Sequence, residues 1–320
     1  MPDSVINTSQ VVHVSVPGSI MLLGEHSVLY SQPAVACAVD RYMRVQVEPL
    51  ASRDVIVESA LGPYCSHLDS LQDSVPHRFL VEILRRWQST LACGLKISIT
   101  SEFSHTVGLG SSAAVTVALV AALRAVCGLP LDQQEILRSS VEVVRAVQGR
   151  GSGTDLAASV FGGVIAFDAD ADALQVQRLS SELPIDLYYA GYKTPTTDVL
   201  ARVAEERVQV PGVVDTLYRL MGDVSREAIT AIKSDDLSQF GRCMNVYQGL
   251  MDALNVNDAT LSAIVYGLRA LPGVMGAKIS GSGLGDCVCA LGDTGAGLSG
   301  FERIPVSVSP VGVSVDVFPR

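Results

Sequence analysis

The stretch Thr106-Val-Gly-Leu-Gly-Ser-Ser-Ala-Ala114 follows a strand-like run and opens an apolar, helix-like run. Gly108 and Gly110 permit backbone angles and close approaches that a side chain would forbid. Ser111 and Ser112 are typical N-cap residues, and a helix N-terminus presents unpaired N–H groups with a partial positive charge. A strand, a glycine-rich loop and a helix start in this order favour a phosphate site over an ordinary capped turn.

This loop differs from the two commonest phosphate-binding loops. A P-loop ends in Gly-Lys-Ser or Gly-Lys-Thr, and the chain has no Gly-Lys pair. The dinucleotide pattern Gly-x-Gly-x-x-Gly has Ala113 in place of its third glycine, a position where alanine is sometimes allowed. The segments that follow do not alternate strand and helix around a parallel sheet, so a dinucleotide-binding domain is disfavoured.

Composition bounds the class of protein. With 320 residues, the chain is long enough for two domains, and its 48% apolar content can fill a large core. The net charge of −10 argues against a nucleic-acid partner, because phosphate backbones require clustered Lys and Arg. The seven cysteines are scattered without a Cys-x-x-Cys pair, which disfavours zinc and indicates reduced core cysteines of a cytosolic protein.

Targeting signals are lacking in the sequence. Residues 1–10 have neither a positive start nor an apolar core, so we expect no signal peptide. The longest apolar run, residues 113–123, is too short to span a bilayer. These features predict a cytoplasmic protein without a membrane partner.

Hydrophobic periodicity predicts a mixture of strands and helices. Strands are expected at 11–16, 19–24, 34–40, 41–48, 55–59, 95–100, 164–167, 185–191, on both sides of a glycine turn within 274–291, and at 306–318. Helices are expected at 79–91, 111–127, 132–147, a short segment from 155, 198–209, 213–232, 237–254 and 258–270. Pro17-Gly18 is expected to break the first strand, and residues 60–76 to form a loop.

Three further stretches place charged or glycine-rich residues beside these elements. Glu25 and His26 directly follow an apolar strand, where ligand contacts are common and an exposed turn is the simpler interpretation. Asp155 follows the glycine-rich segment 149–153. It is either a first-turn carboxylate favoured by the helix dipole, or a base or charged orienting group that faces the loop at 108–112, called the phosphate loop below. Glycines alternate at 281–285, where backbone can approach an anion or form a bulged hairpin.

Together these stretches resemble the GHMP small-molecule kinases, a family that includes galactokinase, homoserine kinase, mevalonate kinase and phosphomevalonate kinase. Three motifs carry the resemblance in order and spacing: Pro17-Gly-Ser-Ile-Met-Leu-Leu-Gly-Glu-His26, Gly108-Leu-Gly-Ser-Ser-Ala-Ala114 and Lys278-Ile-Ser-Gly-Ser-Gly-Leu-Gly-Asp-Cys287. The mevalonate kinase branch is the most similar, because Gly24-Glu-His-Ser-Val-Leu-Tyr30 resembles its first motif and Ser152-Gly-Thr-Asp-Leu-Ala-Ala-Ser159 its segment with the catalytic aspartate.

The resemblance implies a role for each matching residue. The phosphates of ATP would be bound by two loops, Gly108, Leu109, Gly110, Ser111 and Ser112 in the first and Gly281, Ser282 and Gly283 in the second. The acceptor would be bound by Glu25, His26, Thr196 and Thr197. Asp155 would accept or orient the proton of the acceptor hydroxyl, and Ser112 would bind Mg²⁺. Such roles suit phosphoryl transfer, which needs positioning and charge neutralisation more than covalent chemistry.

Two positions depart from the pattern of mevalonate kinases. Ser19 stands where they typically carry a lysine beside the aspartate, and Arg150, Lys193 or Lys278 would have to replace its charge. Val144 stands at the position of their magnesium-binding glutamate. We therefore name Glu142, two residues away on a different helical face, as the candidate carboxylate ligand of Mg²⁺, with Asp286 as a further acidic candidate.

The expected architecture follows from the resemblance. It is an α+β, two-domain GHMP kinase fold, with a ribosomal protein S5 domain 2-like domain in residues 1–180 and a ferredoxin-like domain in residues 181–320. The expected reaction is ATP-dependent phosphorylation of the 5-hydroxyl of mevalonate in isoprenoid precursor synthesis. The alternatives are another kinase of the family (phosphomevalonate kinase, mevalonate 3-kinase or a sugar kinase) and a nucleotide-binding regulator with the kinase fold. A homodimer is also consistent with the resemblance.

Overall fold

The computed structural model describes residues 10–104, 107–170 and 173–319, and two sheets organise this part of the chain. The large sheet has the order β12-β1-β2-β5-β3-β4, with β6 and β7 joined to it through β2, and the small sheet has the order β11-β8-β10-β9. The large sheet consists of β1 (Gln10–Leu23), β2 (Ala34–Pro49), β3 (Asp54–Glu58), β4 (Tyr64–His67), β5 (Leu95–Ser101), β6 (Val164–Asp170), β7 (Ala173–Ser180) and β12 (Ser314–Pro319). The small sheet consists of β8 (Ile185–Tyr189), β9 (Val274–Ser280), β10 (Cys287–Gly292) and β11 (Glu302–Pro305).

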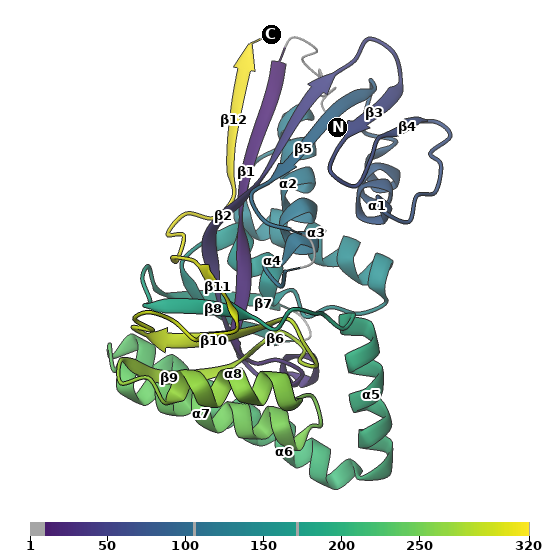
Figure 1. Cartoon of the computed structure of the whole chain (residues 1–320). Helices are drawn as coiled ribbons and strands as arrows, with labels where there is room; N and C mark the ends of the chain where they lie inside the picture. The colour runs from purple at the N-terminus through teal and green to yellow at the C-terminus, as the bar shows by residue number, and fades with distance from the viewer. Residues whose placement is uncertain (1–9, 105–106, 171–172, 320) are drawn as a thin grey trace.

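Helices cover both sheets and divide between them (Figure 1). Those of the first half are the 3₁₀ helix η1 (Ser27–Tyr30), α1 (Arg78–Trp87), α2 (Ser111–Val126), α3 (Gln133–Gln148) and α4 (Thr154–Phe161). Those of the second half are α5 (Thr196–Gln209), α6 (Pro211–Lys233), α7 (Leu237–Ala253) and α8 (Ala259–Arg269). Helices α2 and α4 pack on β1 and β2, whereas α7 and α8 pack on β9. The fold is therefore α+β, as expected, with each of the two sheets covered by its own set of helices.

The long antiparallel pair β1 and β2 is the backbone of the large sheet. Pro17-Gly18 does not end β1, contrary to the sequence prediction, because a register shift between these two residues lets the pairing with β2 continue to Leu23. A bulge of this kind absorbs a residue that lacks an N–H donor and changes the direction of the strand. Likewise, the two strands expected at 34–40 and 41–48 are one continuous strand. The bulge directs the second half of β1 towards the phosphate loop, where the Ser19 N–H donates to the Leu109 carbonyl at 3.1 Å.

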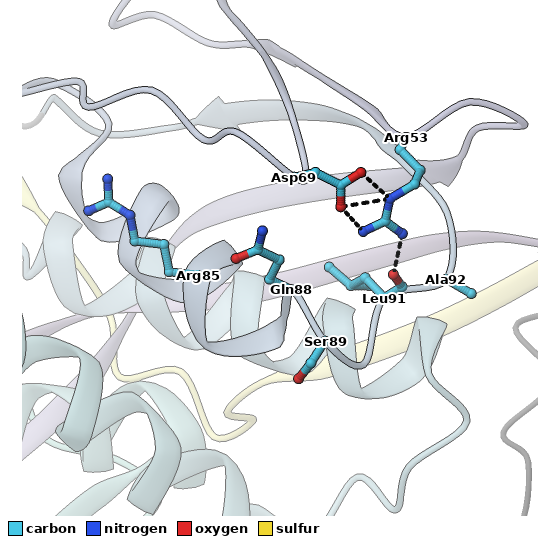
Figure 2. Close-up of a pocket in the computed structure, with 7 residues that line it drawn as sticks. All are labelled: Arg53, Asp69, Arg85, Gln88, Ser89, Leu91 and Ala92. Atoms are coloured by element: carbon cyan, nitrogen blue, oxygen red, sulfur yellow. Dashed lines mark hydrogen bonds and ion pairs between the residues drawn. The ribbon is translucent and has the colours of Figure 1, made fainter.

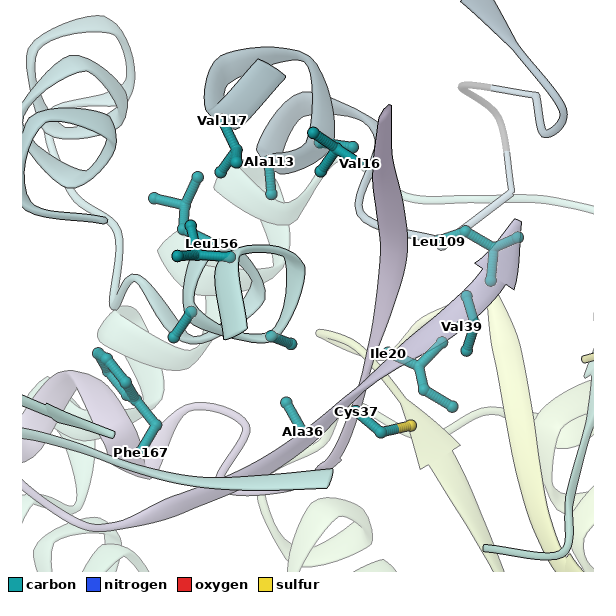
Figure 3. Packing of buried hydrophobic residues seen from close by; sticks show 14 of the residues in the cluster. Val16, Ile20, Ala36, Cys37, Val39, Leu109, Ala113, Val117, Leu156 and Phe167 are labelled. Atoms are coloured by element: carbon teal, nitrogen blue, oxygen red, sulfur yellow. The ribbon is translucent and has the colours of Figure 1, made fainter. Parts of the chain in front are cut away.

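The core beneath the phosphate loop is built from small and branched side chains. Figure 3 shows Ile20, Val39 and Leu109 on one side of the β1–β2 pair, with Val117 of α2 and Leu156 of α4 on the other. All five side chains are buried. Helix α2 is buried along most of its length, as its almost uninterrupted apolar sequence requires, and this fixes the position of its N-terminus.

Other elements differ from the sequence prediction in detail. Residues 60–76 contain strand β4, and the polar segment 168–182 contains β7, which forms a hairpin with β6. Of the closing strand expected at 306–318, only the end is a strand, β12, which pairs with β1 in the large sheet. Strand β11, which pairs with β8 in the small sheet, comes before it at 302–305 and was not expected. The chain therefore returns to the large sheet after the proposed division at residue 180.

Among the helices that the structure describes, none is long and apolar enough to cross a membrane. The sequence prediction about a leader concerns residues 1–10, of which the structure describes only Gln10. Thr106, the first residue of the phosphate-loop stretch, also lies outside the described residues.

Candidate active site

Helix α2 begins directly after the phosphate loop. Its N-cap is Gly110, with φ of +65°, and not Ser111 or Ser112 as the sequence suggested. A Cβ at Gly110 would lie 2.2 Å from the Ser19 hydroxyl, so only glycine lets the loop meet β1 this closely. The first N–H groups of an α-helix have no partner within the helix, and here no side chain of the N-cap residue can supply one. The turn is therefore built to accept an anion at the start of α2.

Asp155 lies in the first turn of α4, next to the phosphate loop. Its carboxylate oxygen Oδ1 accepts a hydrogen bond of 3.1 Å from the Ser19 hydroxyl. Ser19 is fully buried, and its backbone N–H binds Leu109 of the loop. One residue of β1 therefore connects the loop and the carboxylate, which brings together the first two sequence motifs and the predicted catalytic residue.

The environment of Asp155 opposes its ionisation. Protein atoms surround the carboxylate, although part of the residue remains accessible to solvent, and this burial raises the pKa of Asp155. The hydrogen bond from Ser19 and the charge of Lys193 lower the same pKa, while the charges of Glu25 and Asp286 raise it. A carboxylate with a raised pKa is a better proton acceptor than an ordinary aspartate, as general base catalysis requires.

Glu25 follows β1 and forms a buried ion pair. Its oxygen Oε1 lies 2.5 Å from Nζ of Lys278 on β9, and both side chains are at least 98% buried. The hydroxyl of Tyr247 on α7 donates to the Glu25 carbonyl at 2.9 Å. The second carboxylate oxygen, Oε2, is buried and has no partner among the described residues. Glu25 thus retains one acceptor atom for a ligand.

His26 has a left-handed backbone conformation, with φ of +61°, which is uncommon for a residue with a side chain. Its ring nitrogen Nε2 lies 2.9 Å from the Ser282 carbonyl and must donate there, because a carbonyl only accepts. Burial lowers the pKa of His26, so the neutral ring is favoured. Nδ1 is then an acceptor, buried and without a partner among the described residues. The charged pair of the sequence is therefore not an exposed turn.

The third glycine-rich stretch connects β9 to β10 and faces the first motif. The hydroxyl of Ser280 donates to the Met21 carbonyl at 2.9 Å. Gly281, Gly283 and the intervening Ser282 form a turn with φ of +96° and +90° at the two glycines. The turn joins antiparallel strands, as the hairpin interpretation predicted, and lies close enough to β1 to line the same site as the first motif.

Lys193, in the segment between β8 and α5, brings a positive charge close to Asp155 and Asp286. Its Nζ lies 3.0 Å from Oδ2 of Asp286, and its side chain is 33% exposed. Of the three basic residues considered from the sequence, it is the one whose charge lowers the pKa of Asp155. Lys278 is instead paired with Glu25, and Arg150 donates to the Thr197 carbonyl at 3.3 Å.

The remaining predicted residues lie at the edge of the site or away from it. Thr196 and Thr197 are exposed in the first turn of α5, and the contact of Arg150 with Thr197 joins that turn to the loop before α4. Glu142 does not point into the loop region: its 59% exposed side chain pairs with Arg86 of α1 at 3.2 Å. The geometry thus gives no support to Glu142 as a metal ligand.

An open pocket beside α1 is unsuited to phosphate. It is lined by Arg53, Asp69, Arg85, Gln88, Ser89, Leu91 and Ala92, and includes none of the three motifs (Figure 2). The Arg53 guanidinium is already bound to the Asp69 carboxylate and the Leu91 carbonyl. Arg85 is paired with Asp73 at 2.7 Å. The cations of this pocket are therefore already neutralised.

Two family models match this chain, and their ranges include the second and third motifs. The family model of the GHMP kinase N-terminal domain matches residues 76–163, and that of the GHMP kinase C-terminal domain matches residues 228–300. Mevalonate kinase from Pyrococcus furiosus is 32% identical over 301 residues, covering 88% of this chain and 89% of that protein. Mevalonate kinase from Thermococcus onnurineus is 33% identical over 307 residues, with the same coverage of both chains.

The chain belongs to the GHMP kinase family. It is therefore an ATP-dependent phosphotransferase that acts on an alcohol group.

Solved structures of GHMP kinases and of a further protein share this fold. A protein from Listeria innocua superposes with a TM-score of 0.84 at 20% identity, covering 96% of this chain and 99% of that one. Lactococcus lactis galactokinase, solved with galactose, gives 0.79 at 16% identity and covers 96% of each chain. Methanococcus jannaschii mevalonate kinase superposes with a TM-score of 0.74 at 22% identity, covering 93% of this chain and 98% of that one. Because kinases for different acceptors superpose this well, the fold alone does not identify the acceptor.

Proposed function

We propose that this kinase transfers the γ-phosphoryl group of ATP to the 5-hydroxyl of mevalonate, a step in isoprenoid precursor synthesis. The observation that carries the proposal is the Ser19–Asp155 hydrogen bond beside the phosphate loop, which positions a carboxylate with a raised pKa next to an anion-binding helix start. The choice of acceptor rests on the names of the most similar relatives, which are mevalonate kinases.

In the proposed reaction, the loop from Gly108 to Ser112 and the start of α2 hold the phosphates of ATP. Asp155 accepts the proton of the acceptor hydroxyl as that oxygen bonds to phosphorus, and ADP leaves. Mg²⁺, when bound, neutralises charge on the phosphates. We assign the Ser112 hydroxyl as one ligand of this Mg²⁺.

Glu25 and His26 would hold the acceptor. The lone pair on Nδ1 of His26 can accept a hydrogen bond from a hydroxyl group, and Oε2 of Glu25 can accept another. The pairing with Lys278 engages Oε1 of Glu25 and leaves Oε2 without a partner among the described residues. Thr196 and Thr197, at the edge of the site, would complete the pocket from α5.

The test is magnesium-dependent ADP release by the purified protein with ATP and each of mevalonate, phosphomevalonate and galactose. Phosphorus NMR then assigns the position of the phosphate in the product. Formation of mevalonate 5-phosphate is the expected result. Turnover of another acceptor alone would replace the substrate and keep the assignment of the site.

A nucleotide-binding regulator is the alternative that one observation favours, because serine replaces the usual lysine beside Asp155. It predicts that the protein binds ATP and releases no ADP with any acceptor. The kinase proposal predicts instead that Asp155→Asn strongly lowers turnover while leaving ATP affinity unchanged.

A further inference from the structure

Asp286, between β9 and β10, lies directly against the phosphate loop. A Cβ at Gly108 would lie 2.2 Å from its Oδ1 and 2.3 Å from its Oδ2, so the carboxylate occupies the space beside that glycine. A phosphate held by the loop would meet this negative charge at close range. Two anions in such proximity repel each other unless a cation lies between them.

The backbone fixes Asp286 in this position. Its N–H donates to the Tyr192 carbonyl at 2.7 Å, and its own carbonyl accepts from the Ala190 N–H at 2.9 Å. The residue has φ of +70°, a conformation that Asp and Asn adopt more readily than other side chains. The direction of the carboxylate is thus set by the segment that follows β8.

The two carboxylate oxygens have different environments. Oδ2 pairs with Lys193 at 3.0 Å. Oδ1 is buried and has no hydrogen-bond partner among the described residues. The residue as a whole is 8% exposed, so little solvent can reach this oxygen. Leaving a buried carboxylate oxygen without a partner costs free energy, which a ligand at that oxygen would recover. Oδ1 is the oxygen nearest the position of a Cβ on Gly108.

A magnesium ion suits this arrangement better than a metal bound by protein alone. Within the described ranges, no group of three or more His, Cys, Asp or Glu side chains is arranged to hold a metal ion. Mg²⁺ usually takes one or two carboxylates and completes its shell with water and substrate phosphates. A single carboxylate oxygen beside a phosphate loop meets this requirement.

The other acidic candidates are engaged elsewhere. Asp155 accepts from Ser19, and Glu142 pairs with Arg86 at the surface. We propose that Asp286 is the carboxylate ligand of the divalent cation that accompanies ATP, taking the place that the sequence gave to Glu142. This inference rests on the proposed use of ATP and adds the metal ligand of that site.

The experiment measures nucleotide binding and does not depend on turnover. A non-hydrolysable ATP analogue is titrated into the full chain by calorimetry, once with MgCl₂ and once with EDTA. Asp286→Asn is the main variant, because Asn tolerates the same backbone conformation and has nearly the same shape. Glu142→Gln tests the competing carboxylate, and Lys193→Met removes the partner of Asp286 without removing the proposed ligand.

The wild-type chain is expected to bind the magnesium complex more tightly than the free nucleotide. Asp286→Asn should weaken binding of the magnesium complex by about tenfold or more and leave binding in EDTA unchanged or stronger. Glu142→Gln and Lys193→Met should keep the dependence on magnesium. Electron paramagnetic resonance of Mn²⁺ with the nucleotide complex should show the same loss of metal affinity in Asp286→Asn alone.

Equal losses with and without magnesium in Asp286→Asn would assign this residue a structural role and overturn the inference. Loss of the magnesium effect in Glu142→Gln, with none in Asp286→Asn, would overturn it in favour of Glu142. A wild-type chain that binds no nucleotide under either condition would refute the proposed function itself, and the metal site with it.

Discussion

The hydroxyl of Ser19 donates to Oδ1 of Asp155 across 3.1 Å, joining two residues that are 136 positions apart in the chain. In mevalonate kinases the position of Ser19 typically carries a lysine, so a neutral donor here replaces a charged one. The positive charge of the site comes instead from Lys193, which approaches from the segment before α5. Burial, together with the charges of Glu25 and Asp286, raises the pKa of Asp155, and Ser19 and Lys193 lower it.

Ser19→Ala is expected to move the acid limb of the pH–rate profile to higher pH. Burial already raises the pKa of Asp155, and the hydrogen bond from Ser19 lowers it, so removal of that bond raises the pKa further. Since Asp155 acts in its ionised form, the loss of activity on lowering the pH then begins at a higher pH than in the wild type. Kinetic profiles of both proteins test this. Ser140→Ala, which removes a buried hydroxyl within α3, is the matched control and should leave the profile in place.

Asp155→Asn is expected to lower kcat by about 10²- to 10⁴-fold and to stabilise the protein at neutral pH. The pKa of Asp155 is raised in the folded state, so its contribution to stability is present at low pH and is lost as pH rises through the folded pKa. A neutral amide avoids this loss.

The melting temperature of Asp155→Asn at pH 7 should therefore exceed that of the wild type by about 2 °C, and the difference should shrink as pH falls. Thermal melts between pH 5 and pH 8, in steps of about half a unit, measure the trend. A variant that is less stable at pH 7 would contradict the assigned pKa direction.

Lys193→Met is expected to reduce kcat on the order of 100-fold with a smaller effect on acceptor KM. It removes the charge that lowers the pKa of Asp155, so the acid limb of the profile should also move to higher pH. Lys193→Arg should restore part of the rate. Lys96→Met, at a surface lysine 3.5 Å from Glu58, is the control. An unchanged kcat in Lys193→Met would show that the charge of Lys193 does not contribute to the reaction.

Local signals in the sequence predicted most helices well. The helix expected at 132–147 is α3, and its N-cap Asp132 accepts a hydrogen bond from the Glu135 N–H at 3.0 Å, as an aspartate at that position favours. Strand continuity was harder to predict, because the bulge at Pro17-Gly18 depends on pairing with β2. The interpretation of Ser111 and Ser112 as caps was wrong because close contact with Ser19 requires glycine at position 110.

The sequence motifs indicate which residues lie near one another, but they do not show which side chains are in contact. Motif order placed Glu25, His26 and Asp155 in one site, yet no local pattern shows that Glu25 pairs with Lys278 or that Lys193 meets Asp286. Such contacts join segments that lie far apart in the chain and depend on how the two sheets pack. Tyr247, which holds the Glu25 carbonyl, was missed because a tyrosine in an amphipathic helix is usually a core residue.

Lys278→Met is expected to destabilise the fold strongly. Both members of the Glu25–Lys278 pair are buried, so removing one leaves an uncompensated charge in the interior, at a cost of about 3–5 kcal/mol. Urea unfolding monitored by circular dichroism gives the free energy of unfolding. The double variant Glu25→Gln with Lys278→Met should recover part of the loss, because it leaves no charge behind. Equal stabilities for the single and double variants would show that charge burial is not the cause.

Gly108→Ala is expected to reduce ATP affinity because a methyl group at this position would lie 2.2 Å from Oδ1 of Asp286. To relieve the contact, the Asp286 side chain must rotate away from Lys193, or the phosphate loop or the turn between β9 and β10 must move. Each of these changes alters the surface that we propose to bind the nucleotide. Gly249→Ala in α7 is the control, since a Cβ there meets no described heavy atom within 4 Å. Calorimetric titration with the ATP analogue should show at least about a tenfold loss for Gly108→Ala and none for Gly249→Ala. Combining Gly108→Ala with Asp286→Gly removes the clash, so recovery of affinity in EDTA would identify steric conflict, and no recovery would contradict it.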